Sequence, residues 1–407
     1  MTSAPHAARR LLLPGRVVTP DDVVDDGVVA VEDGRILHAG PRAASTRQLG
    51  EAWSDDSGEA ATPSWWRPGL TLLPGLVDLH CHGGAGGEFG TGTEESVLAA
   101  RHHQRHGTTS VVASLVSAPA DTLRAGVSTL APLVTSGEVA GIHLEGPFLS
   151  SVRCGAQDPA ALVDVDLSLV EELCALAAGG LRHVTFAPER DPHGRLPAAL
   201  AAHGVVGSLG HTDADHDTCA AALATVAGYG VAGGRALVTH LFNGMPPLHH
   251  RAPGPVGAAL GAAVRGKAVI EVIADAVHLA GPTVRLLFDT AGAGAIALVS
   301  DAMSASGLPE GAYTLGGRSV TVAGREARLS EGGSLAGGVS TLLEQVRWCV
   351  QELGVDLLDA VTAASLTPAR AIGLPDVGAL VPGAHADVVV VDESLELQRV
   401  LRRGTWL

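Results

Sequence analysis

The chain has 407 residues, which suits one large domain or two, and its 46% hydrophobic and 17% charged residues supply ample material for a buried core. Such a composition is too apolar for a disordered chain. The formal net charge of -16 repels nucleic acid and anionic membrane surfaces, so we expect neither as a partner. A phosphorylated substrate would therefore need a local basic site to overcome the same field.

The compartment signals favour a soluble, cytoplasmic protein. The five cysteines are odd in number and scattered, and no CxxC motif occurs, which fits a reducing compartment better than a disulfide framework. The N-terminus carries an arginine pair followed by only three leucines, which is too short a run for the core of a signal peptide. No stretch approaches the ~18 apolar residues of a membrane span.

Both chain ends are predicted to form short strands. Residues 11–20 and 27–40 contain apolar runs broken by turn residues, and residues 378–407 have the same pattern. Between the first strands and the middle of the chain, residues 41–69 are rich in Ser, Asp, Glu and Pro and predict a long surface loop. We expect the two ends to pair into one small β-sandwich domain formed by residues 1–73 and 376–407.

The middle of the chain, residues 74–375, has a different rhythm. Apolar, β-branched runs recur about every 25–40 residues, the size of a βα unit, and each is followed by an Ala/Leu-rich segment suited to a helix. The runs are residues 70–80, 109–117, 139–147, 181–189, 205–211, 236–243, 268–275 and 295–303. Continuous apolar runs suit strands that are buried on both faces. Eight of them in a row predict an α/β fold of the TIM-type (β/α)8 barrel class.

Polar residues stand at the carboxyl ends of five of these runs, where barrel enzymes carry their chemistry. They are His80, His82, Glu145, His211, His240 and Asp301. His80 and His82 are two residues apart, so on an extended strand both imidazoles point the same way and can share a metal.

The residue types at these ends suit metal-dependent hydrolysis. Glu145, His211 and His240 offer a carboxylate and two nitrogens, a sensible ligand set for zinc with one position left for water. Zinc lowers the pKa of bound water toward neutrality. Asp301, at the last strand, is the candidate general base that accepts the proton of that water and hands it to the leaving group.

Each of these residues alone has an ordinary structural explanation. A single HxH motif is weak evidence for ligands, and Asp301 alone could be a helix N-cap. The occurrence of these residues together, at five strand ends of one barrel, favours a functional site. A catalytically inactive relative that serves as a scaffold is the alternative from a different class, but such a protein is expected to lose metal ligands, and here all are present.

At these residues the chain resembles the amidohydrolase superfamily, and within it the deacetylases of amino-sugar phosphates. PGLVDLHCHG (74–83) is similar to the widely shared first-strand signature, and HLEGPFL (143–149) is more specific because it puts the metal carboxylate on the third strand. Most of the superfamily uses a modified lysine on the fourth strand, which reads VTFAPE here. The remaining matches are GHTDA (210–214), THLFNGMPPLHHR (239–251), ADAVH (274–278), SDAM (300–303) and LAGG (335–338).

The resemblance implies substrate contacts, a cofactor and a partner. Asn243 and the backbone of Gly244 would hold the sugar phosphate, and Arg251 would reach the phosphate from the neighbouring subunit of a homodimer. His278 would contact the sugar. The acetyl end would be lined by Leu335, Ala336 and Gly337. The implied cofactor is a divalent metal, Zn2+ in the first instance, with one or two ions per subunit.

Two features depart from the resemblance or are left open by it. Many members carry a histidine after the metal glutamate, where it polarises the amide carbonyl, but the matching residue here is Gln157, which can donate a hydrogen bond and cannot become a cation. Some members lack one or both histidines of the first strand and hold a single metal. Because both are present here, a two-metal site bridged by Glu145 is possible. The epimeric preference for glucosamine or galactosamine phosphates also stays open.

Overall fold

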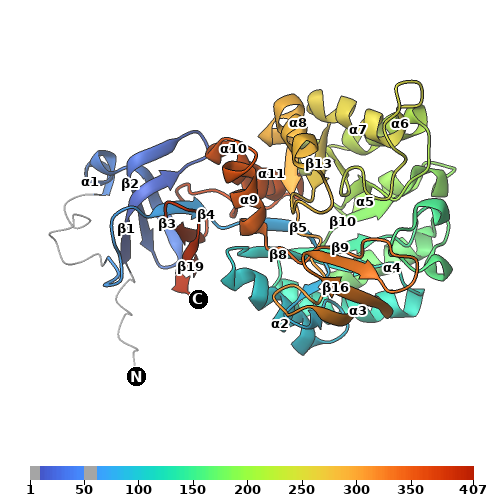
Figure 1. The fold of residues 1–407 in the computed structure, drawn as a ribbon, viewed down its shortest axis with the longest axis horizontal. Coiled ribbons are helices and arrows are strands. Elements are labelled where there is room, and N and C mark those ends of the chain that lie inside the picture. The colour runs from blue at the N-terminus through green and yellow to red at the C-terminus, as the bar shows by residue number, and fades with distance from the viewer. Residues whose placement is uncertain (1–9, 50–61) are drawn as a thin grey trace.

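The computed structural model of the chain describes residues 10–49 and 62–407. Its centre is an eight-stranded parallel sheet in which the strands follow one another in chain order (Figure 1). These strands are β5 (Val77–Cys81), β8 (Ser110–Val116), β9 (Gly141–Glu145), β10 (Leu181–Phe186), β11 (Val206–Leu209), β12 (Ala236–Val238), β13 (Ala268–Val272) and β14 (Ile296–Leu298). Every predicted run contributes a strand to this sheet, so the predicted barrel class is confirmed.

Helices cover the outside of the barrel because each strand is buried on both faces and each following segment has one apolar side. They are α2 (Thr93–Arg105), α3 (Ala120–Thr135), α4 (Leu167–Ala177), α5 (Leu196–Ala202), α6 (His216–Gly228), α7 (Gly254–Val264), α8 (Gly281–Ala291), α9 (Leu342–Gln351), α10 (Leu357–Ala364) and α11 (Leu366–Ala371). Short 3-10 helices are η2 (Ser151–Arg153), η3 (Pro159–Ala161), η4 (Pro188–Arg190), η5 (Val231–Gly233) and η6 (Ala293–Ala295). Among the described residues, no helix has the length and apolar character needed to span a membrane.

The first and last strands of the barrel meet at their carboxyl ends. Asp301 N donates to His80 O at 2.8 Å, and His82 N donates to Ala302 O at 2.8 Å. Deeper in this seam, the buried Asp78 carboxylate accepts a hydrogen bond from Ser300 N at 3.2 Å. The closure therefore places the candidate residues of the first strand directly beside Asp301.

The two chain ends form a separate seven-stranded sheet, at the left of Figure 1, with the order β20-β19-β18-β4-β1-β2-β3. Its strands are β1 (Arg10–Val18), β2 (Val23–Glu32), β3 (Arg35–Pro41), β4 (Thr71–Pro74), β18 (Val388–Val391), β19 (Leu397–Arg402) and β20 (Thr405–Trp406). The predicted pairing of the two ends is thus confirmed. The run at 70–80 serves both parts, because β4 belongs to this sheet and β5 to the barrel. We keep the division into 1–73 with 376–407 and 74–375 as a proposal.

Gly75 makes the sharp step between β4 and β5 possible. A β-carbon on this residue would lie 2.1 Å from Thr109 Oγ1 and 2.7 Å from Asp387 Cβ, so only glycine fits at this junction.

The surface loop predicted at 41–69 is partly wrong. Residues 42–49 form helix α1 (Arg42–Leu49), because Ala, Arg, Gln and Leu are good helix formers and the segment itself contains no proline. Residues 50–61 of the predicted loop lie outside the described residues, and so do the first nine residues of the predicted N-terminal segment.

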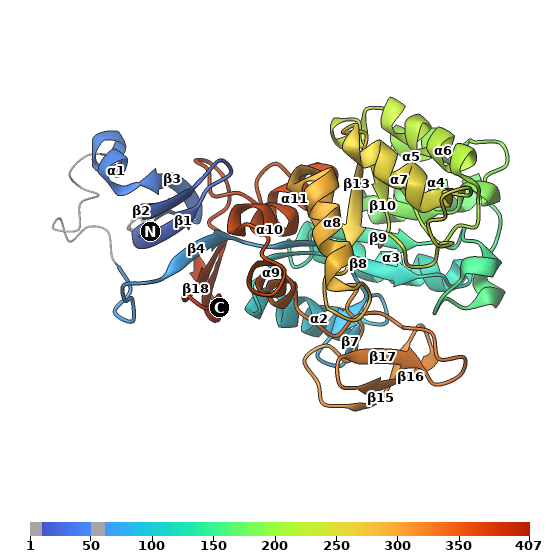
Figure 2. The same cartoon turned by 45° about the horizontal axis from the view of Figure 1, so that its top comes forward.

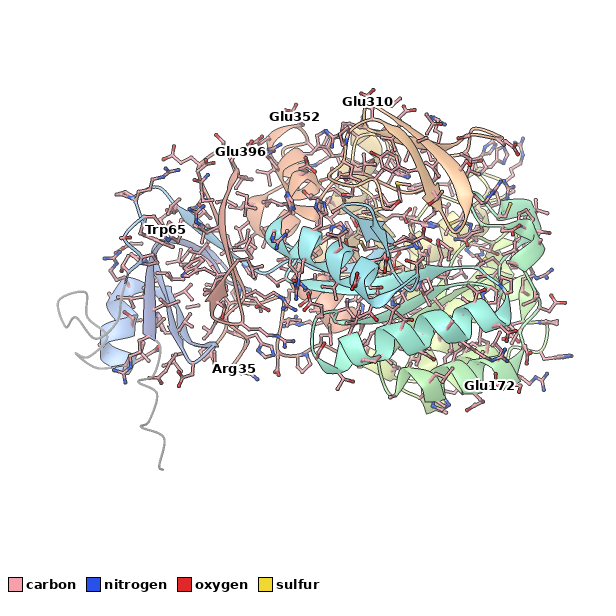
Figure 3. All side chains as sticks on the ribbon, turned by 90° about the horizontal axis from the view of Figure 1, so that it is seen from below. Arg35, Trp65, Glu172, Glu310, Glu352 and Glu396 are labelled. Carbon is pink, nitrogen blue, oxygen red and sulfur yellow. The ribbon has the colours of Figure 1, made fainter. Side chains whose placement is uncertain are left out.

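An antiparallel sheet inserted between β14 and α9 has no counterpart in the sequence prediction. It consists of β15 (Gly311–Leu315), β16 (Arg318–Ala323) and β17 (Glu326–Leu329), and we call it the β15–β17 arm. Figure 2 shows it projecting from the barrel beside β7 (Gly87–Glu88), which pairs with β6 (Gly83–Gly84). In Figure 3 Glu310, next to the arm, lies at the upper edge of the molecule, and Trp65 lies in the small domain at the left.

Candidate active site

The candidate residues stand where the chain leaves the barrel strands. His80 and Glu145 are in β5 and β9, and His211, His240 and Asp301 follow β11, β12 and β14. Those last three have positive φ angles of 47°, 26° and 46°, a backbone region that non-glycine residues rarely adopt. Strain of this kind, roughly 1–3 kcal/mol per residue, clusters at functional sites. The turns bring the side chains to one mouth of the barrel.

Glu145 lies between two histidine pairs. Its Oε1 is 3.0 Å from His211 Nε2 and 2.9 Å from His240 Nε2, which we call the second histidine pair. Its Oε2 is 3.2 Å from His82 Nε2 and 3.6 Å from His80 Nε2, the first histidine pair. One carboxylate therefore faces both pairs, as the bridging role expected from the sequence requires.

Asp301 completes the first histidine pair. Its Oδ1 is 3.4 Å from His80 Nε2 and 3.3 Å from His82 Nε2, and the two Nε2 atoms are 3.0 Å apart. All these side chains are buried. The ligand atoms of His80, His82 and Asp301 all lie within 4.8 Å of one another. The same holds for the ligand atoms of His80, Glu145 and His240. Imidazole nitrogens and carboxylates converging in a buried site fit a divalent cation.

The pKa shifts within the cluster show that its carboxylates favour a positive charge beside them. Burial alone lowers the pKa of His80, but Asp301 and Glu145 outweigh burial and raise that pKa well above its ordinary value. Burial raises the pKa of Asp301, but His80 and His82 outweigh it and bring that pKa to about 2. Glu145 behaves likewise, because the neighbouring histidines outweigh burial and hold its pKa well below the usual range. A divalent cation meets the same electrostatic demand.

A cavity of about 280 Å³ opens above the cluster. Its lining combines the candidate metal ligands other than His80 with loop and arm residues: His82, Glu145, Gly155, Ala156, Gln157, His211, His240, Asn243, Gly244, His278, Asp301, Leu315, Ser334, Leu335 and Gly337. Two predicted substrate residues are absent from it. Ala336 is fully buried, and Arg251 is exposed on the loop after β12. Gly155, Ala156, Leu315 and Ser334 were missed, because no local pattern indicates which loop or arm residues reach the mouth.

Gln157 is held in one orientation. Its Oε1 accepts a hydrogen bond from Ser117 N at 2.8 Å, and its Nε2 donates to Glu145 Oε2 at 2.5 Å. The β15–β17 arm fixes its backbone, since Arg318 Nη1 donates to the carbonyl oxygens of Ala156 and Gln157 at 3.2 and 3.1 Å. The amide nitrogen therefore points to the cluster.

The other predicted substrate residues are also positioned locally. His278 Nδ1 is 2.8 Å from Asp275 Oδ2; burial lowers the pKa of His278, but Asp275 outweighs burial and raises it. Asn243 Nδ2 donates to His240 O at 3.2 Å. Gly244 has φ of 61°, and a β-carbon there would lie 2.7 Å from His211 Nδ1, so glycine is required at this close approach.

The chain matches the family model described as the amidohydrolase family over residues 71–407. It is 33% identical over 397 residues to the N-acetylglucosamine-6-phosphate deacetylase of Bacillus subtilis (strain 168), covering 95% of this chain and 94% of that protein. It is 32% identical over 395 residues to the N-acetylgalactosamine-6-phosphate deacetylase of Escherichia coli O157:H7, covering 96% and 97%. Among solved structures, a variant of the N-acetyl-D-glucosamine-6-phosphate deacetylase of Mycobacterium smegmatis, in complex with N-acetyl-D-glucosamine-6-phosphate, matches with a TM-score of 0.87 and 35% identity, covering 98% and 99% of the two chains.

Proposed function

The chain belongs to the amidohydrolase family, and we propose that it hydrolyses the acetamide of N-acetyl-D-glucosamine 6-phosphate to D-glucosamine 6-phosphate and acetate in amino-sugar catabolism and cell-wall recycling. The observation that carries the proposal is the place of Glu145, a third-strand glutamate whose two oxygens face two histidine pairs beneath a cavity. The family is metal-dependent, and the cluster of histidines and carboxylates is a candidate metal site.

The residues divide into ligands and a base. Glu145 with the second histidine pair would hold one divalent ion, Zn2+ in the proposal, and the first histidine pair offers a second position. An ion held there supplies a Lewis acid for the amide carbonyl and lowers the pKa of water. Asp301, at the rim of the cavity, accepts the proton of the attacking water and then protonates the departing amine.

The substrate contacts follow from the cavity lining. Asn243 and Gly244 would hold the sugar phosphate, and His278 would contact the sugar. Leu335 and Gly337 would line the acetyl end, with the buried Ala336 between them in the chain. Gln157 would donate to the amide carbonyl, because its nitrogen already points to the cluster. Arg251 is exposed and does not line the cavity of its own chain, which supports a homodimer in which it reaches the partner's phosphate. All five cysteines are free thiols, which supports a cytoplasmic location.

Replacing Asp301 with asparagine tests the proposed chemistry. We expect Asp301→Asn to keep most of its bound metal and to lose about 100- to 10,000-fold in kcat, because a general acid-base group contributes about that much. The measurements are metal content by elemental analysis and acetate release from the phosphosugar. Turnover near the wild-type rate would remove Asp301 from its role.

The galactosamine epimer is the second candidate substrate, favoured by the similarity to the N-acetylgalactosamine-6-phosphate deacetylase. Acetate release is therefore measured on both epimeric phosphosugars, with unphosphorylated N-acetylglucosamine as the control. Purified protein that contains no divalent ion and takes none up would contradict the enzyme proposal itself.

A further inference from the structure

Glu271 is a buried carboxylate that the roles above do not use. It belongs to β13, has 0% exposure, and does not line the cavity. Burying a carboxylate without polar partners is costly, so its neighbours indicate what it does.

One oxygen of Glu271 contacts residues of both histidine pairs. Its Oε2 is 3.1 Å from Nδ1 of His80, in the first pair, and accepts a hydrogen bond from the backbone N of His240, in the second pair, at 3.2 Å. The backbone of Glu271 adds a further tie, because its carbonyl oxygen accepts a hydrogen bond from Leu241 N at 2.9 Å.

The contact between Glu271 and His80 influences which ring nitrogen of His80 is free to bind a cation. An imidazole that binds a cation through Nε2 carries its proton on Nδ1, and an acceptor at Nδ1 holds that tautomer and the ring plane. His82 and His211 have carbonyl acceptors there, Ser114 O at 3.2 Å and Arg153 O at 2.7 Å. His80 has a carboxylate instead, which is the stronger acceptor.

His240 is held in another way. Its Nδ1 is buried and has no hydrogen-bond partner among the described residues, so no hydrogen bond at Nδ1 orients its ring. Its backbone has φ of 26°, a conformation that the surroundings must hold in place. The hydrogen bond from His240 N to Glu271 Oε2 lies at this turn.

We propose that Glu271 is a positioning residue that sets His80 through its ring and His240 through its backbone, and thereby couples the two histidine pairs. The proposal rests on the proposed metal centre. It predicts that losing the carboxylate weakens cation binding at both pairs and not only at the first.

The test is a Zn2+ and Co2+ titration of the full-length protein, with Co2+ followed by its visible absorption. Glu271→Gln is nearly isosteric and removes only the charge and one acceptor oxygen. We expect its affinity for both ions to fall about 10- to 100-fold, with a changed Co2+ spectrum. Ser208→Ala is the matched control, because Ser208 is equally buried and its hydroxyl is hydrogen-bonded to Thr239 Oγ1 at 2.6 Å, not to a candidate ligand. Ser208→Ala should bind both ions as the wild type does.

A second set of variants, made in the His80→Asn protein, distinguishes coupling of the two histidine pairs from support of His80 alone. In His80→Asn, the added change Glu271→Gln should weaken the remaining cation site further, whereas support of His80 alone predicts no further loss. Circular dichroism establishes that each variant is folded, and Glu271→Asp, which keeps the charge but withdraws it by one methylene, should also lose affinity if Glu271→Gln does not fold. A wild type without cation binding contradicts the proposed function. Wild-type binding with unchanged affinity in the folded Glu271 variants overturns only the coupling.

Discussion

At the scale of single residues, Gln157 offers an amide where the resemblance leads us to expect an imidazole. The side chain accepts from Ser117 N and donates to Glu145 Oε2, so its two ends cannot exchange without breaking both hydrogen bonds. A buried amide fixed in this way keeps a donor at the cluster without carrying charge. In the proposed mechanism, oxyanion stabilisation would therefore depend more on a bound cation than on this residue.

Three substitutions of Gln157 test its role. Gln157→Ala should lower kcat about 10- to 100-fold, at or below the effect of removing a dedicated oxyanion donor. Gln157→Glu should be worse, because it replaces the donor with a second carboxylate beside Glu145. Gln157→His should remain active. The measurement is steady-state acetate release at equal metal content, and a Gln157→Ala enzyme as fast as the wild type would deny this residue a catalytic role.

At the scale of elements, the β15–β17 arm couples an insertion of the last βα unit to the loop after β9. Arg318 of β16 donates to the carbonyl oxygens of Ala156 and Gln157, and the residues after β17 return to line the same cavity with Leu335 and Gly337. The arm has its own small apolar core, which includes Leu315 and Val320. We therefore expect the arm to support one wall of the cavity.

Removing the guanidinium of Arg318 tests this support. Arg318→Met should raise KM for the phosphosugar about 3- to 10-fold, because two hydrogen bonds of ordinary strength are lost from a loop that lines the cavity. Metal content should stay unchanged. Arg325→Met, in the exposed turn between β16 and β17, is the control and should leave KM unaltered. Equal KM values for both variants would show that the arm does not position the loop.

At the scale of the whole molecule, the candidate site draws on strands from across the barrel. Its candidate ligands come from β5 and β9 and from the ends of β11, β12 and β14. A cation bound to the folded state and not to the unfolded chain stabilises the fold by mass action. The barrel and its metal should therefore unfold together.

Metal removal measures this linkage. Chelation should lower the free energy of unfolding by about 3 kcal/mol relative to protein held at 100-fold the dissociation constant of the ion, and restored metal should recover it. The readout is the shift in Tm. Glu145→Ala, which lacks the carboxylate between the pairs, should show little shift on chelation, and a shift as large as in the wild type would place the stabilising ion elsewhere.

Subunit mixing tests the proposed dimer. Arg251→Gln and Asp301→Asn should each be nearly inactive at low substrate concentration. Unfolded together and refolded, they should regain activity, because in mixed dimers one site combines an intact Asp301 with the partner subunit's intact Arg251. If Arg251 serves its own subunit, no site in the mixture is complete and activity does not return.

Local patterns were enough to predict the barrel and the residues at its mouth. Continuous β-branched runs are a property of neighbouring residues, and the carboxyl ends of parallel strands meet at one mouth whatever the loops do. His80, Glu145 and Asp301 could therefore be placed together before any contact was known. Helix α1 was missed because a polar composition was given more weight than its helix formers.

Contacts between distant residues could not be predicted in this way. Asp78 and Ser300, 222 positions apart, meet at the barrel seam, and Glu271 lies 191 positions from His80, whose ring it contacts. The orientation of Gln157 depends on Ser117, 40 residues away, and on the arm. The residue types at the strand ends determine what the site can bind, whereas the packed fold decides how each side chain is held, because hydrogen bonds between separate strands and loops exist only once the chain has closed.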